Sequence, residues 1–331
     1  MEALCQLCMH ACGHDIHTTS LIATAEILAK DREGWRGTLF ICAQPAEETG
    51  QGAEAMLRSG LFTNFPRPDI CLGQHVMPLA AGTVGHNSEV ALSASINVDI
   101  TLIGKGGHGS LPHVAIDPVV MASSLIMKLQ TIRSRELAGD VRAVITVGFV
   151  NSGLKHNVIP DEAHIGLNIR TEYPRSAANS QCYPPDGSRR STGVSCPQTT
   201  GDYHIRRFPL TSNSEPIDQR ILAVHRALMG HENVIELPTF MGSEDFSRYG
   251  LPGRHHYGGE PVQYCFWFFG GHSRELYNAA PGDTPIAKLS HLPSNHQSNF
   301  APDPEPTLRG GVSALTSASL AYLPATGMQK V

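Results

Sequence analysis

Residues 37–52, GTLFICAQPAEETGQG, indicate the class of fold. The first eight form an apolar run of strand length, and the Pro- and Gly-containing stretch that follows is typical of a loop. Residues 70–76, ICLGQHV, predict a second buried strand, and a short helix ending at Gly60 is predicted between the two. We therefore expect two strands joined by a helix, which favours an α/β layer with a mostly parallel sheet.

Helical periodicity precedes this unit and returns far downstream. Upstream, apolar residues recur at helical spacing from Leu21 to Ala29, and Thr18 or Thr19 is available as the helix cap. Downstream, three more elements are predicted, namely helices at residues 221–229 and 307–320 and a strand at residues 266–271, FWFFGG. We expect these segments to complete the first layer.

Residues 88–206 have a different pattern. Apolar and polar residues alternate from Ile96 to Leu102, which predicts a strand with one wet face. Asp117 and Pro118 have the residue types of a helix N-cap and first turn. Two further strands are predicted at residues 142–150, RAVITVGFV, and 162–170, EAHIGLNIR. This mixture favours an α+β domain inserted into the first one.

The predicted domain organisation therefore has three parts. Residues 1–87 and 207–331 form the two halves of one domain, and residues 88–206 form the inserted domain. Within the insert, residues 175–206 are rich in Ser, Gly, Pro and Thr and show no apolar period. So long a structureless stretch is uncommon inside a domain, and it indicates disorder or an error in the gene model.

The bulk composition argues against several functional classes. With 331 residues, 41% of them hydrophobic and 17% charged, the chain resembles an ordinary globular protein. A net charge of -5 gives no basic footprint for nucleic acid, and no apolar run has the length of a membrane span. The N-terminus lacks the pattern of a secretion signal, and the eight cysteines show no regular disulfide spacing. We expect a cytoplasmic protein.

Metal-ligand residue types gather at the ends of predicted strands. Cys12 and His14 are two apart, so their side chains project to the same side of an extended segment, and thiolate and imidazole both bind zinc. Glu47 and Glu48 follow the first strand, and His75 ends the next one. Ligand sites of open α/β sheets lie at these carboxyl ends. One carboxylate can bind metal while the other faces the attacking water.

His296, in LPSNHQSNF, lies far away in sequence and just before the last predicted helix. Each of these residues has an ordinary interpretation when taken alone, as a free cysteine, a loop histidine or a solvated carboxylate. Several of them at the ends of neighbouring elements favour a shared metal centre.

Seven stretches in order resemble the signatures of the M20 metallopeptidase family: MHACGHDIHTT, QPAEETGQGA, GQHVMP, GKGGHGSLPH, NVIPDEA, GSEDFS and SNHQSNFAP. They are most similar to its amidohydrolase branch, which includes hippurate, N-acyl-amino-acid and auxin-conjugate hydrolases. The resemblance covers most of the chain outside residues 175–206. It implies an α/β catalytic domain of the di-metal exopeptidase type with an inserted α+β, ferredoxin-like dimerisation domain.

The resemblance also implies a metal centre of two divalent ions per subunit, Zn or Mn. Cys12 would bridge the two ions. His14 and His75 would complete separate metal shells with Glu48 and His296.

The catalytic and substrate-binding roles are implied in the same way. Glu47 would be the general base. His108 on the inserted domain would reach a neighbouring active site in a homodimer and support the oxyanion, with His113 as its rival. Asn157 and Gly242 match positions that contact the substrate. The substrate would be a small N-acyl amino acid or a peptide-like amide.

Two departures from the family pattern bear on this expectation. Relatives carry a strand-helix-strand region before the CGHD motif, whereas this chain begins almost at that motif, so part of the sheet is expected to be missing and the chain to fold poorly. The polar stretch at residues 175–206 also replaces a helix. The alternatives are a non-catalytic remnant that binds metal or a partner, and an aminopeptidase or carboxypeptidase of the same family. Glu47 favours an enzyme, and a cysteine rather than an aspartate at the bridging position favours the amidohydrolase branch.

Overall fold

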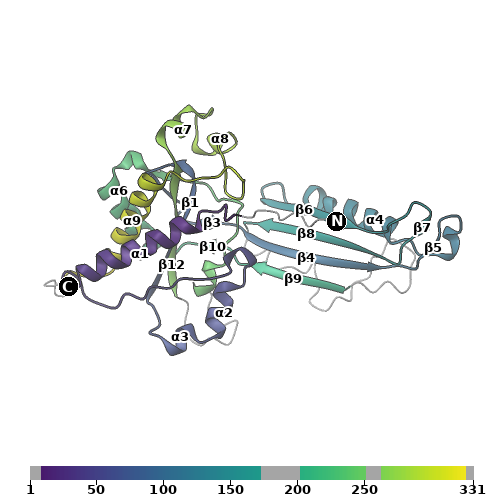
Figure 1. Ribbon diagram of the computed structural model, residues 1–331, viewed down its shortest axis with the longest axis horizontal. Coiled ribbons are helices and arrows are strands. Elements are labelled where there is room, and N and C mark those ends of the chain that lie inside the picture. Colours follow the sequence, from purple (N-terminus) through teal and green to yellow (C-terminus); the bar gives the residue numbers. More distant parts are fainter. Residues whose placement is uncertain (1–8, 173–201, 251–261, 326–331) are drawn as a thin grey trace, which may run out of the picture.

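The computed structural model describes residues 9–172, 202–250 and 262–325. They form two bodies that lie end to end (Figure 1). We call residues 94–171 and 202–208, which build an elongated antiparallel sheet, the lateral body. The other described residues form the main body, in which helices cover a mixed sheet.

The sheet of the main body has four strands. In spatial order they are β1 (Ile70–Ala80), β12 (Gln263–His272), β2 (Val84–His86) and β11 (Val234–Glu236). β1 runs parallel to β12 and β11 parallel to β2, whereas β2 and β12 are antiparallel. The α/β class predicted from the sequence is confirmed, with a sheet that is mixed rather than wholly parallel.

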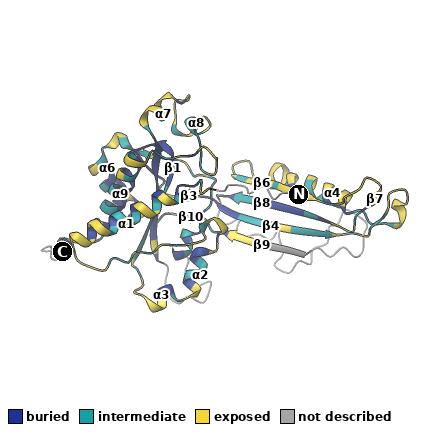
Figure 2. Cartoon of the chain, viewed as in Figure 1, coloured by how far each residue is buried: buried dark blue, intermediate teal, exposed yellow. Residues whose placement is uncertain are grey.

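Three long helices pack on this sheet, namely α1 (His14–Lys30), α6 (Glu215–Met229) and α9 (Pro304–Leu320). Their apolar residues and those of β1 and β12 form a core that appears dark blue in Figure 2. Its buried members include Ile16, Val76, Ile221, Trp267, Phe269, Phe300 and Leu315. Four shorter helices complete the main body: α2 (Gly52–Arg58), α3 (Leu61–Asn64), α7 (Arg274–Ala279) and α8 (Pro285–Leu289).

A buried chain of polar side chains crosses this core. His225 Nε2 lies 3.0 Å from the carbonyl oxygen of Ala314, which can only accept, so that nitrogen donates. Burial, and then the charge of His86, lower the pKa of His225 to about 4, so its neutral ring accepts at Nδ1 from His86 Nε2, 2.8 Å away. His86 Nδ1 lies 2.9 Å from Asp218 Oδ1. His86 therefore links Asp218 to His225 through its two ring nitrogens, and the three side chains form one buried hydrogen-bonded chain.

The lateral body is a four-stranded antiparallel sheet with one long helix along it. Its strands, in spatial order, are β6 (Ala143–Asn151), β8 (Glu162–Thr171), β4 (Ala94–Ile103) and β9 (Asp202–Phe208). The helix α4 (Pro118–Thr131) packs its Ala122 and Leu129 against Val98, Ile165 and Leu167 of the sheet.

Two short strand pairs mark the ends of the lateral body. β3 (Val90–Leu92) pairs with β10 (Thr211–Ser212) in the main body, where the lateral body begins. β5 (Gly107–His108) pairs with β7 (Val158–Ile159) at the opposite tip (Figure 1). Residues on β5 and β7 are therefore remote from the main-body sheet of the same chain.

Most elements predicted from sequence patterns are present. Asp117 caps α4 as predicted, because its carboxylate accepts from the backbone N–H of Val119 at 2.8 Å. The alternating segments form β4, β6 and β8, and the downstream segments form α6, β12 and α9. Of the described helices, none is both long and apolar enough to cross a bilayer.

The strand predicted at residues 37–44 is wrong. These residues belong to no strand, and no described strand pairs with them. Apolar composition predicts burial between layers, whereas a strand also requires a hydrogen-bonded neighbour. The segment therefore has the composition of a buried strand but no hydrogen-bonded neighbouring strand among the described residues.

Two smaller predictions also need correction. Thr18 and Thr19 are not caps, because α1 already begins at His14 and both hydroxyls bond to carbonyls four residues back. Residues 202–206, included in the patternless stretch, belong to β9 and pair with β4, so their conformation is set by the neighbouring strand. Residues 175–201 lie outside the described residues.

Candidate metal centre

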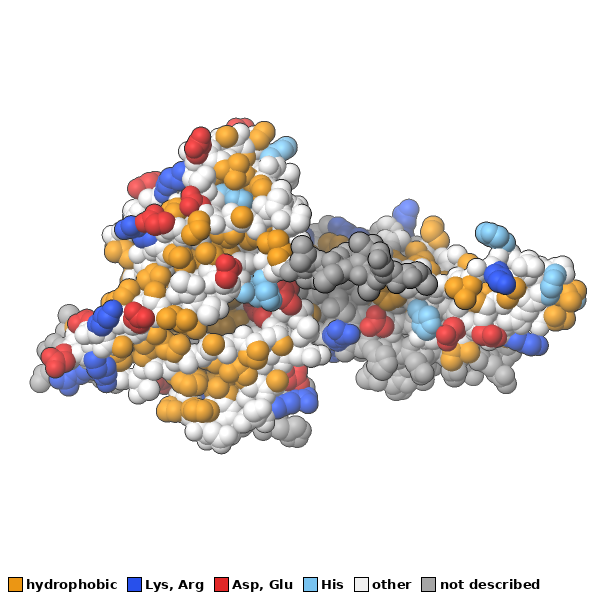
Figure 3. Space-filling view, in the orientation of Figure 1, with side chains coloured by type: hydrophobic (Ala, Val, Ile, Leu, Met, Phe, Trp, Pro, Cys, Tyr) orange, Lys and Arg blue, Asp and Glu red, His pale blue; other side chains and the backbone are white. Residues whose placement is uncertain are grey.

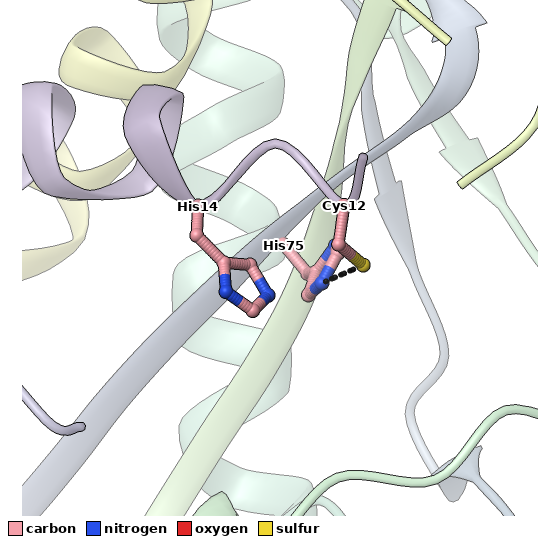
Figure 4. Close-up of side chains that lie close together, drawn as sticks. All are labelled: Cys12, His14 and His75. Carbon is pink, nitrogen blue, oxygen red and sulfur yellow. Dashed lines mark hydrogen bonds between the residues drawn. The ribbon is translucent and has the colours of Figure 1, made fainter. Parts of the chain in front are cut away.

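The turn before α1 places two predicted ligands against β1. Gly13, at φ +80°, reverses the chain between Cys12 and His14, and a Cβ at Gly13 would lie 2.3 Å from Val76 Cγ1. The missing side chain therefore allows the close approach of the turn to β1. His75, on β1, lies beside Cys12 and His14 (Figure 4).

All five predicted ligands lie close together. Cys12 Sγ is 3.1 Å from His296 Nε2 and 3.5 Å from His75 Nε2. Glu48 Oε1 is 3.3 Å from His296 Nε2 and 3.5 Å from His14 Nε2. Residues 284 positions apart in sequence thus meet at one point.

The ligand atoms fall into two groups of three that share a cysteine. Cys12 groups with His14 and His75, and again with Glu48 and His296, with all ligand atoms of a group within 4.8 Å of one another. His14 also groups with Glu47 and Glu48, so the division of the ligands between two separate metal shells stays a prediction. A thiolate, imidazoles and a carboxylate are donors that suit Zn²⁺ and also admit Mn²⁺.

Two of the predicted ligands, Cys12 and His75, have the ionisation of buried groups. His75 Nδ1 lies 2.7 Å from the carbonyl oxygen of Val76, so Nδ1 carries the proton and the lone pair of Nε2 faces Cys12. Burial lowers the pKa of His75 to about 4, which keeps its ring neutral. Burial, and then the charge of Glu48, raise the pKa of the Cys12 thiol to about 12. A cation at this point would favour the thiolate.

Glu47 lies beside the ligand Glu48 but in a different environment. Burial, and then the charge of Glu48, raise the pKa of Glu47 to about 7. Glu244 is more deeply buried, and burial followed by the charge of Glu47 holds its pKa well above the ordinary value. Glu244 therefore keeps a proton, which it donates in a hydrogen bond to Glu47. A carboxylate with a pKa near 7 suits general-base work at neutral pH.

Backbone strain is concentrated at the same place. Ala46, immediately before Glu47, has φ +56°, and His296 has φ +71°. They are the two non-glycine residues with positive φ in the described part of the chain. Such conformations cost of order 1 kcal/mol each and cluster at functional sites.

Three supporting residues were not predicted from the sequence. Asn295 Nδ2 donates to the carbonyl oxygens of Cys12, at 3.2 Å, and Val76, at 3.1 Å, and so ties the cysteine turn to β1. His17 Nε2 accepts from the backbone N–H of Val76 at 2.9 Å, with its ring 4.3 Å from that of His75. Glu244 contacts Glu47 as described. All three lie inside the recognised motifs, which is the signal that could have identified them.

The remaining predicted residues are divided between the two bodies. Gly242 lies at the main body, where its carbonyl accepts from Ser93 Oγ at 3.0 Å. His108 and Asn157 lie together at the far tip of the lateral body, and the carbonyl oxygen of Asn157 accepts from the backbone N–H of Gly109 at 2.9 Å. The structure therefore brings these two residues together, but away from the metal centre of the same chain (Figure 1).

The hydrogen bonds of His108 fix which ring nitrogen is available. Its Nδ1 accepts from the backbone N–H of Ser110 at 3.1 Å. A neutral ring then carries its proton on Nε2, which is free to donate to an external oxygen. His113, the rival for this role, lies in the exposed turn Pro112–Val114. The fixed tautomer favours His108.

The family model for Peptidase family M20/M25/M40 matches residues 8–284 of this chain. The chain belongs to this family. The match covers Cys12, His14, Glu47, Glu48 and His75 and ends before His296. The resemblance stated from seven short motifs is confirmed by this match.

The curated relatives of this M20-family chain include amidohydrolases. It is 36% identical over 251 residues to IAA-amino acid hydrolase ILR1-like 4 of Arabidopsis thaliana. The aligned residues cover 74% of this chain and 56% of that relative. It is 44% identical over 163 residues to the hippurate hydrolase of Campylobacter jejuni, which is 49% of this chain and 42% of that enzyme. The chain thus spans about half the length of the curated relatives it matches.

Solved structures share the fold. A putative aminohydrolase from methicillin-resistant Staphylococcus aureus has a TM-score of 0.72 at 24% identity, with 97% of this chain and 76% of that chain covered. The Bacillus subtilis YXEP protein, described as a dinuclear metal-binding peptidase from the M20 family, has a TM-score of 0.63 at 24% identity, covering 96% and 74%. This M20-family chain therefore has the fold of a dinuclear metal-binding peptidase.

Proposed function

We propose that this chain provides the hydrolytic centre of a metal-dependent amidohydrolase that cleaves N-acyl amino acids or similar small amides. One observation carries the proposal: two groups of three metal-ligand atoms share Cys12, and Glu47 lies directly beside them. Two divalent ions, Zn or Mn, held by Cys12, His14, Glu48, His75 and His296 would lower the pKa of a bound water and stabilise developing negative charge.

The chain's own residues then carry out the proton transfers. Glu47, whose pKa near 7 allows it to accept a proton at neutral pH, takes the proton of the attacking water and passes it to the leaving nitrogen. Glu244 holds Glu47 in place through its hydrogen bond. A substitution that removes only Glu47, the acceptor of the water proton, should stop turnover without removing the ions.

The substrate class is supported by the names of relatives and by one cation. Relatives include an IAA-amino acid hydrolase, a hippurate hydrolase and an N-acetyl-L-cysteine deacetylase. Arg170 of β8 is half-buried and donates to the carbonyl oxygen of Met241, next to Gly242, but it forms no ion pair with any carboxylate in the described ranges. A half-buried guanidinium without an acidic partner suits the carboxylate of an amino acid.

We also propose that the active form is a homodimer. His108 and Asn157 lie too far along the lateral body to act on the centre of their own chain, yet the Nε2 proton of His108 is available to an oxyanion. Exposed apolar residues on the lateral body, including Val120 and Met127 of α4, provide a surface that a second copy can cover. In a dimer, His108 would reach the metal centre of the partner.

The test separates the roles of the two adjacent carboxylates. Glu47→Gln keeps the shape but removes the base, so we expect metal content near wild type and turnover reduced by about 10²–10⁴-fold. Glu48→Gln should lose metal. Metal content is measured by elemental analysis after dialysis, and turnover on a panel of N-acyl amino acids. If Glu47→Gln loses metal while Glu48→Gln keeps all of it, Glu47 is the metal ligand and Glu48 is the base.

A further inference from the structure

His296 is the most exposed of the five predicted ligands, and its backbone is strained. Its side chain is 64% exposed, whereas Cys12 is 8% exposed. In Figure 3, histidine and acidic side chains lie together on the surface of the main body, on the side that faces the lateral body. A non-glycine residue keeps a positive φ, here +71°, only where its surroundings impose it. Since little packing covers His296, hydrogen bonds of its own segment have to hold it in place.

The segments that carry Cys12 and His296 are joined by two hydrogen bonds at consecutive residues. The backbone N–H of His296 donates to the carbonyl oxygen of Ala11 at 2.7 Å. The side-chain Nδ2 of Asn295 donates to the carbonyl oxygen of Cys12 at 3.2 Å. The first bond needs no particular side chain, whereas the second depends on the identity of residue 295. Asn295 thus joins the two segments through the chemistry of its side chain.

Asn295 also reaches the segment that carries His75. Its Nδ2 lies 3.1 Å from the carbonyl oxygen of Val76. The same oxygen accepts from His75 Nδ1 at 2.7 Å, and this bond fixes which nitrogen of His75 faces Cys12. A third contact of Asn295 Nδ2, at 3.7 Å, is with the sulfur of Cys12 itself. One amide nitrogen therefore lies at the meeting point of three ligand-bearing segments.

The chemistry of a primary amide suits this place. The amide nitrogen carries two N–H donors and no charge, and each carbonyl oxygen has two lone pairs, so Asn295 and His75 can share the oxygen of Val76. Lysine or arginine could also donate, but each would place a positive charge beside a site for two cations. Residues that bond to metal ligands orient those ligands, and their loss commonly costs about 10–100-fold in metal affinity.

We propose that Asn295 is a positioning residue of the metal centre, which holds Cys12, His75 and His296 at the spacing at which they can share bound ions. The inference rests on the proposed function, because it assigns a role within the same centre. Asn295 acts through the ligands and takes no part in bond breaking. The competing interpretation is that Asn295 only stabilises the loop before α9.

Asn213 provides a matched control for the experiment. Its Nδ2 also bridges two backbone carbonyl oxygens, those of Asn87 at 2.8 Å and Phe266 at 2.9 Å, and its side chain is buried. Neither of these two residues is a predicted metal ligand. Leucine keeps nearly the size of asparagine and removes the donor. Asn295→Leu and Asn213→Leu therefore delete the same kind of bridge, one at the metal centre and one away from it.

Three measurements compare these two variants with the wild type. Hydrogen exchange of the His296 amide is followed in the metal-free protein. The affinity for Zn²⁺ is measured by competition with a chromophoric chelator. The absorption spectrum is recorded with saturating Co²⁺, because a sulfur-to-cobalt charge-transfer band reports the bond between Cys12 and the ion. A residue that only stabilises the loop would leave this spectrum unchanged at saturation.

In Asn295→Leu we expect the His296 amide to exchange faster by about tenfold or more, because its segment opens locally more often. We also expect the affinity for Zn²⁺ to fall by about 10–100-fold, and the charge-transfer band to change in intensity or position. Asn213→Leu should match the wild type in all three measurements. If Asn295→Leu is insoluble, Asn295→Ala, which only removes atoms, is measured in the same way.

Two results would overturn the proposal. An unchanged affinity for Zn²⁺ and an unchanged Co²⁺ spectrum in Asn295→Leu would show that the ligands keep their spacing without this side chain. Equal losses in Asn213→Leu would show that the effect comes from general destabilisation. A wild type that binds neither ion would instead contradict the proposed function, and exchange of the His296 amide then decides whether Asn295 holds the ligand segments together.

Discussion

Cys12 is the residue on which the proposed centre depends most, because its sulfur belongs to both groups of ligand atoms. Cys12→Ser should therefore lower the affinity for both ions, by more than the roughly 100-fold that loss of an outer-shell partner costs. Isothermal titration of the metal-free protein with Zn²⁺ measures this. The matched control is Cys42→Ser, which removes another non-disulfide thiol that is not part of either ligand group. If Cys12→Ser binds Zn²⁺ with the stoichiometry and affinity of the wild type, Cys12 does not bridge the two ions.

His225 gives the protein a defined sensitivity to acid. Burial lowers its pKa from 6.5 to about 4, so between these values the unfolded chain binds a proton that the folded chain does not. Stability from this group is complete above about pH 6.5 and is lost as the pH falls toward 4, with a total of about 3 kcal/mol. Urea unfolding at several pH values should show a steeper loss over this window in wild type than in His225→Gln. If the unfolding free energies of wild type and His225→Gln fall equally over this pH range, the pKa of His225 is not lowered by folding.

At the scale of residues, the sequence identifies ligands better than their supports. Ligand chemistry makes Cys12, Glu48 and His75 stand out. The predicted strand ends are wrong, because β1 continues past His75 to Ala80 and residues 37–44, before Glu48, form no strand. The role of His17 depends on a backbone N–H 59 positions away, which no local pattern reveals. The tautomer of His108 likewise depends on the turn geometry of Ser110.

The helix α4 allows a matched test of helix capping at the scale of elements. Asp117 caps α4 with a side-chain hydrogen bond, whereas Asp303 at the same position of α9 makes none. Asp117→Ala should cost about 1 kcal/mol of unfolding free energy, and Asp303→Ala less, because only a charge–dipole interaction is lost. Denaturant unfolding of both variants measures the difference. A larger loss in Asp303→Ala would contradict the assignment of the caps.

Elements with a strong apolar period or a local capping signal can be predicted from the sequence. Elements that depend on pairing with a strand distant in sequence cannot. The alternation in β4 and the Asp-Pro start of α4 are local signals, and both elements occur where they are expected. Residues 37–44 have the apolar content of a strand, but their ladder partner is missing from the described chain. Residues 202–206 show the converse, since they belong to the stretch without an apolar period and yet form part of β9 by pairing with β4.

At the scale of the whole molecule, the proposed dimer predicts complementation between two inactive variants. Glu47→Gln lacks the base and His108→Gln lacks the oxyanion donor. If His108 acts on the partner's centre, a mixed dimer contains one complete site, and an equimolar mixture should regain about a quarter of wild-type activity. The mixture is made by unfolding and refolding the two chains together. If His108 acts within its own chain, no mixed dimer has a complete site and activity stays at the level of the separate variants.

The end-to-end arrangement of the two bodies also affects how the protein diffuses. A compact chain of 331 residues has a radius of gyration of about 20 Å, and an elongated one of the same mass has a larger value and more friction with solvent. A single copy should therefore elute early from a gel-filtration column and resemble a heavier particle. Its mass in solution is best determined by light scattering or sedimentation equilibrium, which do not depend on shape. X-ray scattering of the same sample should show a pair-distance distribution with an extended tail.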